Sequence, residues 1–269
     1  MNIDRKEKKM KLEVLLSVMN LKKEDLDKMN ITSTCTVINQ CEKEDFEEYK
    51  NFKIYSYKER GISNSRNRAL EKAKAEILLL CDDDVIYNKD YEKNIIEEFK
   101  NNSKADIIIF NMENPYRNKR KIKKNKRLHI YNSLNFASYN IAFRRESINN
   151  IKFNTNFGPN AIYKSGGDDT LFIVDCLKNK LKIYSCNKNI GRICSGDSTW
   201  FKGYNEKYFF DKGALYTAIN RQFRFLLISQ HLFRHKEMLD EMKFNDALKA
   251  MLKGSNDYIN KEKERQKNE

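Results

Sequence analysis

The sequence has few of the residues that break or bridge a chain. It contains two prolines and nine glycines in 269 residues, so long flexible linkers are not expected. None of its six cysteines forms a C-x-x-C pair, and Met1 to Lys11 is polar, unlike a signal peptide. No apolar run approaches the roughly 18 residues of a membrane span. We therefore expect reduced thiols in a cytoplasmic protein that does not cross a membrane, with contact to the inner membrane face left open.

Basic charge is concentrated in one stretch. The net charge is +14, and Arg117 to Arg127 holds eight basic residues and no acidic one. Leaving out these eight charges lowers the net charge from +14 to +6. Such a block is usually a solvated segment. Its functional alternatives are attraction to anionic lipid headgroups, to phosphorylated substrates or to nucleic acid.

The first half of the chain alternates strand and helix patterns. This alternation predicts an α/β fold with a mixed, mostly parallel sheet and flanking helices. Ligands of such sheets bind beyond the carboxyl ends of the strands, and polar residues stand at these ends: Asn20, Asn39, Gln40 and Asp82 to Asp84. The predicted strands are Leu12 to Met19, Thr34 to Ile38, Phe52 to Tyr57, Ile77 to Cys81 and Asp106 to Phe110, and the predicted helices are Lys22 to Met29, Ser63 (as N-cap) to Lys74 and Tyr91 to Phe99.

The second half has a different pattern. We expect a strand over Phe136 to Phe143, a polar loop to Gly167, a helix from Asp168 or Asp169, and short strands over Leu181 to Cys186 and Ile190 to Cys194. A segment rich in aromatic residues, Trp200 to Phe210, precedes a helical region, and the charged residues from about Gly254 are expected to fray. These patterns predict a domain over residues 1–195 and a helical, aromatic-rich extension over residues 196–269 packed on it.

Several residues of the predicted extension can be interpreted in more than one way. Large aromatics such as Trp200 and Tyr208 are more often core than a platform for sugars. His231 and His235 have the spacing of a metal pair but lack a partner ligand, so we expect surface residues. The sequence also indicates a basic amphipathic helix, in which Arg221, Arg224, Arg234 and Lys236 are interleaved with Phe223, Phe225, Leu227 and Phe233. This helix either rests on an anionic membrane or packs on the catalytic domain. Packing is slightly preferred.

Three adjacent carboxylates follow the apolar run Ile77 to Cys81. If the extended conformation continues, Asp82 and Asp84 point the same way. Adjacent like charges beside a core raise each other's pKa, and a divalent cation removes the conflict. Oxygen ligands of this type suit Mg²⁺ or Mn²⁺, which keep positions for phosphates. Alternatively, the acidic residues only end the strand.

Three motifs together resemble one enzyme family. They are Glu59 to Asn67 (ERGISNSRN), Ile77 to Asp84 (ILLLCDDD) and Gly166 to Phe172 (GGDDTLF), in this order. The stretch from Leu12 to Leu181 resembles a family 2 glycosyltransferase with the GT-A fold, a hexosyltransferase-type enzyme. Trp200 to Lys212 is similar to the closing segment of small bacterial members that build surface polysaccharides.

The resemblance implies a nucleotide-sugar donor, a divalent metal and inversion at the anomeric carbon. It implies Asp82 and Asp84 as metal ligands in a DxD-type element, Asp169 or its neighbour Asp168 as the catalytic base, and Trp200 and Gly167 near the acceptor. The donor-binding residues that it implies are Asn20, Asn39, Gln40, Arg60, Ser63, Arg66 and Asp82 to Asp84.

The sequence departs from the family pattern at three points. Asn39 and Gln40 replace acidic residues that accept a proton from uracil, but an amide both accepts and donates, so a UDP-sugar is still expected. Cys81 replaces the first acid of the metal motif, and Asp168 replaces a longer Glu. A helix N-terminus would favour the anion of Asp169 and lower its basicity, and a capping role for both aspartates is the alternative.

These observations predict an inverting, Mn²⁺- or Mg²⁺-dependent transferase. We expect a glycan or lipid-linked acceptor, in synthesis of bacterial capsule, exopolysaccharide or another surface glycan, and no nucleic-acid partner. Asp82 and Asp84 would face Asp169 across one crevice. The alternatives are a nucleotidyltransferase acting on a sugar phosphate, and a basic nucleic-acid-binding protein.

Overall fold

The computed structural model describes residues 10–116, 121–129, 138–195, 201 and 203–268. The chain divides into two compact units. The first, here called the sheet unit, comprises Met1–Arg60, Asn64–Lys152 and Asp175–Gly196. The second, the helical unit, comprises Gly61–Ser63, Phe153–Val174 and Asp197–Glu269.

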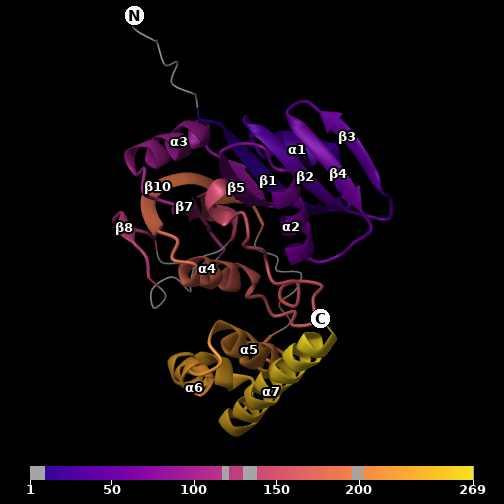
Figure 1. The fold of residues 1–269 in the computed structure, drawn as a ribbon, viewed down its shortest axis with the longest axis vertical. Coiled ribbons are helices and arrows are strands. Elements are labelled where there is room, and N and C mark those ends of the chain that lie inside the picture. Colours follow the sequence, from indigo (N-terminus) through magenta and orange to yellow (C-terminus); the bar gives the residue numbers. More distant parts are fainter. Residues whose placement is uncertain (1–9, 117–120, 130–137, 196–200, 202, 269) are drawn as a thin grey trace, which may run out of the picture. The chain divides into compact units, whose positions relative to one another are not determined.

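A mixed parallel and antiparallel sheet forms the sheet unit (Figure 1). Its strand order is β3-β4-β2-β1-β5-β9-β7-β10-β6, with β8 paired to β10. The run β4-β2-β1-β5 is parallel, whereas β9 is antiparallel to both β5 and β7. The strands are β1 (Leu12–Met19), β2 (Thr34–Gln40), β3 (Asp45–Tyr49), β4 (Phe52–Tyr57), β5 (Ile77–Asp82), β6 (Val85–Tyr87), β7 (Ile107–Glu113), β8 (Lys126–Arg127), β9 (Ile141–Arg144) and β10 (Ile183–Ile193). The predicted fold class, a mixed sheet with flanking helices, is confirmed.

Helices flank the sheet because both faces of its central strands are apolar. Val14 and Leu16 of β1 belong to one core cluster with Leu26 of α1 and Phe99 of α3. The alternate residue Ser17 receives a hydrogen bond from Ser65 of α2, so α2 lies on the opposite face. The helices are α1 (Lys23–Lys28), α2 (Ile62–Lys72), α3 (Tyr91–Asn101), α4 (Asp168–Lys178), α5 (Glu206–Ile219), α6 (Arg224–Arg234) and α7 (Phe244–Asn268).

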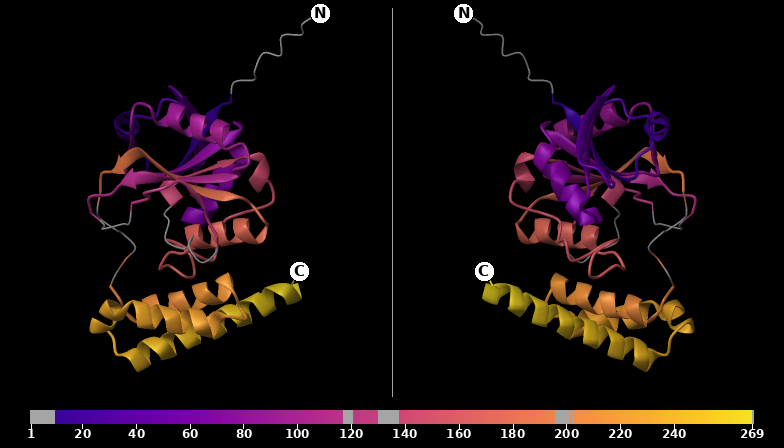
Figure 2. Two further views of the ribbon diagram at one scale, coloured as in Figure 1. Left: turned by 90° about the vertical axis from the view of Figure 1, so that its left-hand side faces the viewer. Right: turned by 90° about the vertical axis from the view of Figure 1, so that its right-hand side faces the viewer.

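In the helical unit, α5 and α7 lie side by side (Figure 2). Their backbones meet at two glycines. A Cβ on Gly213 would stand 1.9 Å from the Met251 carbonyl oxygen, and one on Gly254 would stand 1.9 Å from that of Phe210. A separate apolar core joins α5, α6 and α7, formed by Tyr208, Phe209, Ile228, Leu232, Ala247, Ala250 and Met251. No helix in the described part of the chain has both the length and the apolar character needed to cross a bilayer.

Several local expectations are wrong. Ser63 lies inside the first turn of α2 and does not precede it. Leu181 to Cys194 contributes one strand, β10, with shifted register, where two were expected. The residues after Gly254 are helical within α7, because Gly254 is buried against α5. His231 is also buried and hydrogen-bonded to Tyr216, where a surface residue was expected.

Candidate active site

Asn20, Asn39 and Gln40 meet at the carboxyl ends of β1 and β2. The Asn20 N–H donates to the Gln40 carbonyl at 3.2 Å, and Asn20 takes the left-handed φ of 50° that asparagine tolerates. The Asn39 amide accepts from the Leu21 N–H and donates to Ser56. Asn39 therefore ties together the ends of three strands, β1, β2 and β4.

Gln40 has an unused hydrogen-bonding atom. Its side chain is 3% exposed, and its Oε1 atom has no hydrogen-bond partner among the residues that the structure describes. A buried acceptor without a donor is costly. Arg60 fixes the backbone beside it by donating to the Gln40 carbonyl at 2.6 Å and pairing with Glu42. The Gln40 amide thus offers an acceptor that a ligand N–H would satisfy.

The acidic turn begins where β5 ends. Asp82 is the last residue of β5, and Asp83 and Asp84 form a turn, so the expected continuation of the extended conformation is wrong. Asp82 is paired at 2.9 Å with Arg66 of α2, whose side chain is 5% exposed. The pKa of Asp83 is raised by partial removal from water and then by the charge of Asp82. The charge of Asp82 therefore opposes the ionisation of Asp83.

The chemistry of these carboxylates fits a hard divalent cation. Asp82 and Asp84 are both half-buried and offer oxygen ligands. Among the described residues, no three His, Cys, Asp or Glu side chains come together as a set able to hold a metal ion. Mg²⁺ in enzymes is commonly held by one or two carboxylates, with waters and substrate phosphates completing its shell. A pair of aspartates is therefore a sufficient protein contribution.

Asp168 and Asp169 begin α4 after a glycine turn. Gly166 and Gly167 have φ values of 75° and 105°, which L side chains rarely adopt, and the Gly167 carbonyl accepts the N–H of Leu171. Asp168 is 6% exposed, whereas Asp169 is half-buried. Both carboxylates lie in the first helical turn, where the helix dipole favours anions.

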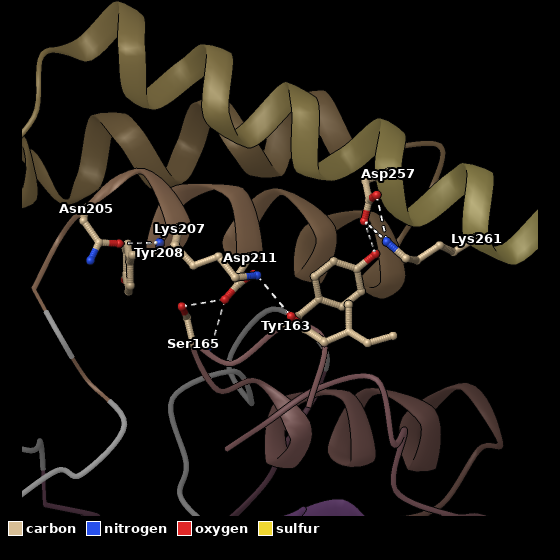
Figure 3. A network of polar contacts seen from close by, with 9 residues as sticks. Tyr163, Ser165, Asn205, Lys207, Tyr208, Asp211, Asp257 and Lys261 are labelled. Atoms are coloured by element: carbon tan, nitrogen blue, oxygen red, sulfur yellow. Dashed lines mark hydrogen bonds and ion pairs between the residues drawn. The ribbon is translucent and has the colours of Figure 1, made fainter. Parts of the chain in front are cut away.

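The α5 helix fixes this glycine turn (Figure 3). Asp211 is 1% exposed and accepts hydrogen bonds from the N–H and hydroxyl of Ser165, at 3.1 and 2.8 Å. Lys207 pairs with the same Asp211 at 2.5 Å. Leu215, one turn further on, fills the space where a Gly167 side chain would stand, 2.7 Å from the Cβ position. The loop conformation therefore depends on residues more than forty positions away.

Lys212 places a cation beside both candidate bases. Its ammonium donates to the Ser165 carbonyl at 3.0 Å. Burial lowers the pKa of Lys212, and the charges of Asp169, Asp211 and Asp168 oppose that shift. The sequence pattern did not single out Asp211 or Lys212, although Lys207, four residues before Asp211 in a predicted helical region, was a signal for an ion pair.

The candidate residues fall into two groups. The sheet unit brings together Asn20, Asn39, Gln40, Arg60, Arg66 and Asp82 to Asp84, and the helical unit holds Ser63, Gly167, Asp168 and Asp169. The Ser63 hydroxyl is buried and donates to the Phe157 carbonyl at 3.0 Å, which leaves it a structural role in this state. Trp200 lies outside the described residues, as does part of the basic stretch.

The fold and these residues define the class of protein. Polar and acidic residues at the carboxyl ends of adjacent parallel strands, in a mixed α/β sheet, are the arrangement expected of a GT-A-type transferase. The sequence model of glycosyl transferase family 2 matches residues 34–172, more than half of the chain. The chain belongs to this family and is a glycosyltransferase. No curated protein matched the chain.

Solved structures of glycosyltransferases share the fold. Residues 1–349 of TarS from S. aureus, in complex with UDP-GlcNAc, match with a TM-score of 0.64 and 16% identity, covering 93% of this chain and 81% of that one. The mannosyltransferase PcManGT from Pyrobaculum calidifontis, in complex with GDP-Man and Mn²⁺, matches with a TM-score of 0.52 and 13% identity, covering 91% and 73%. At these identities the likeness concerns the fold alone.

Proposed function

We propose that this chain is an inverting, metal-dependent glycosyltransferase that uses a nucleotide-diphosphate sugar, with a UDP-sugar favoured. The acceptor would be a glycan, or a lipid-linked glycan, of a bacterial capsule, exopolysaccharide or other surface glycan. The observation that carries the proposal is the cluster at the ends of β1, β2 and β5. There Asp82 pairs with the buried Arg66, and the Gln40 Oε1 atom finds no donor within the part of the chain that the structure describes.

The donor would bind at this cluster. Asp82 and Asp84 would hold Mn²⁺ or Mg²⁺, and the bound metal would stabilise the negative charge that grows on the leaving diphosphate. Arg66 holds Asp82 in place through a charged hydrogen bond of 2.9 Å. The Gln40 Oε1 atom would accept the N–H of a uracil edge, which gives the orphaned acceptor a donor.

The acceptor would react at the glycine turn. Its hydroxyl oxygen attacks the anomeric carbon, the bond from that carbon to the phosphate oxygen breaks, and the hydroxyl proton passes to Asp169. The helix dipole works against this step because it stabilises the anion of Asp169. Asp169 is only half-buried in this state, so exclusion of water by bound substrates would have to restore its basicity. Asp168, with a carboxylate buried beside Gly158, would be the supporting residue.

We further propose a division of labour along the chain. Residues 1–195 would carry the transferase, and residues 196–269 would form an extension whose α5 supports the glycine turn through Asp211 and Lys212. The enzyme would act in the cytoplasm. Trp200 and Gly167 would lie near the acceptor.

A panel of nucleotide sugars with and without Mn²⁺ tests the function, with thermal shift and donor hydrolysis as readouts. One nucleotide diphosphate should stabilise the protein only when the metal is present, and Asp84→Ala should abolish this stabilisation. Asp169→Ala should keep the stabilisation but lose transfer. Normal transfer by Asp169→Ala would refute the base assignment, and transfer of the nucleotide with release of pyrophosphate would identify a nucleotidyltransferase instead.

A further inference from the structure

The α6 helix has two apolar faces, and only one is buried. Ile228, His231 and Leu232 point into the core of the helical unit. On the other side Leu226 and Phe233, seven residues apart and therefore on one line along the helix, are 65% and 64% exposed.

Three further aromatic side chains extend this exposed face. Phe223, Phe225 and Phe244 are 57%, 53% and 37% exposed, and the rings of Phe233 and Phe244 lie 5.8 Å apart. We call the five residues Phe223, Phe225, Leu226, Phe233 and Phe244 the α6 surface. Five large apolar side chains exposed on one helix and beside it mark an interaction site more often than single exposed residues do.

The charge along α6 itself has one sign. Residues 220–236 contain four Arg and Lys residues and no Asp or Glu. Arg221, Arg234 and Lys236 are exposed, and the guanidinium of Arg224 lies 4.2 Å from the centre of the Phe225 ring. Of the acidic residues that follow, Glu237 pairs with His235 and Glu241 accepts the N–H of Tyr204. On α6 the cations therefore stand beside apolar side chains, whereas the exposed acidic residues Asp240 and Asp246 lie after the helix, near Phe244.

We propose that the α6 surface docks on an anionic lipid bilayer, with α6 lying parallel to the membrane plane. Phe and Leu side chains of an interfacial helix enter the boundary between headgroups and acyl chains, while Arg and Lys bind the lipid phosphates. A second copy of this chain is the poorer partner, because it would bring two basic surfaces together in a protein of net charge +14. The proposal depends on the α6 surface alone and stands apart from the transfer chemistry.

Vesicle sedimentation with the full chain tests this docking. The protein should bind phosphatidylglycerol-containing vesicles, bind pure phosphatidylcholine weakly, and lose affinity as salt rises. Leu226→Ser together with Phe233→Ser should lower the partition coefficient about tenfold or more, because both side chains lose apolar area that the membrane would bury. Phe46→Ser is the matched control, since Phe46 is 50% exposed in the sheet unit.

The variants at exposed positions should keep the thermal unfolding curve of the parent. Equal vesicle binding by the double serine variant and the parent would overturn the proposal. So would binding that is lost on replacing Lys121, Lys123 and Lys124 with glutamine but not on changing α6, because the basic stretch would then be the contact. A concentration-dependent dimer that forms without lipid and disappears in the double variant would identify a second copy as the partner and equally overturn it.

Discussion

Two groups of carboxylates in this molecule are held in opposite ways. Asp82 ends β5, a strand whose residues from Ile77 to Cys81 are fully buried, and its cation partner Arg66 is only 16 residues away. Asp168 and Asp169 follow two glycines with positive φ, and their loop is fixed by α5, with Asp211 bonded 46 residues from Ser165. The first group is built into a core that folds with it. The second depends on contacts from α5, a helix distant in sequence, so it should fail separately.

The largest expected effect isolates the second group. Asp169→Asn keeps size and hydrogen bonding but removes the proposed proton acceptor, so kcat should fall about 10²–10⁴-fold. Donor affinity, measured by calorimetry with the nucleotide diphosphate and Mn²⁺, should stay within about twofold, because the change lies outside the sheet unit. Asp175→Asn, further along α4, is the matched control and should transfer normally. A loss of donor binding in Asp169→Asn would show that the two groups do not act separately.

The next largest effect concerns acid, which should unfold the two units at different pH values. Burial lowers the pKa of His231 from 6.5 to about 3, with His235 and Lys212 adding to the shift. The unfolded chain therefore takes up this proton first, and the stability contribution is full above pH 6.5 and is lost as pH falls towards 3. At about pH 5 the loss should reach roughly 2 kcal/mol.

Circular dichroism during acid titration would follow this transition. The helical unit should unfold at higher pH than the sheet unit, and His231→Phe should show a flatter dependence on pH. Coincident unfolding of both units in the parent protein and in the variant would count against the separation.

The α5 support can be removed without touching either aspartate of the loop. Asp211→Asn weakens charged hydrogen bonds to Ser165 and Lys207, which should cost about 1–3 kcal/mol of unfolding free energy. The kcat should fall while the KM for the donor changes little. Asp246→Asn, an exposed change on α7, serves as control. Unchanged kcat in a folded Asp211→Asn protein would mean that the loop holds its shape alone.

A smaller effect is expected from the helix contact itself. The Gly213→Ala methyl group would overlap the Met251 carbonyl, so the helices must separate slightly at a cost of about 1–2 kcal/mol. Chemical denaturation followed by far-UV circular dichroism measures this change in the free energy of unfolding. Asn256→Ala, exposed on α7, should be close to neutral. A neutral Gly213→Ala would show that α5 and α7 have room to shift.

The sequence predicted the central sheet well because burial on both faces forces unbroken apolar runs, as in β1 and β5. It missed β3, the polar edge strand Asp45–Tyr49, because only Phe46 and Tyr49 mark it. It placed Asp168 and Asp169 at a helix start, since glycine before acid is a local signal.

Tertiary contacts account for what the sequence left out. The burial of His231 and Gly254 follows from the packing of α5, α6 and α7. The hydrophobic periodicity of the local sequence does not indicate this packing. The role of Asp211 likewise appears only when Ser165 is brought beside it.

The glycine contact between α5 and α7 couples helix packing to the shape of the glycine turn. Gly213 stands two residues after Asp211, and no side chain cushions the helices at this point. A side chain introduced at this contact would push α7 away from α5 and would shift the Asp211 carboxylate, which accepts hydrogen bonds from Ser165. Loss of this support would lower kcat in a way that a higher concentration of sugar donor could not restore, because the loop and not donor binding would be affected.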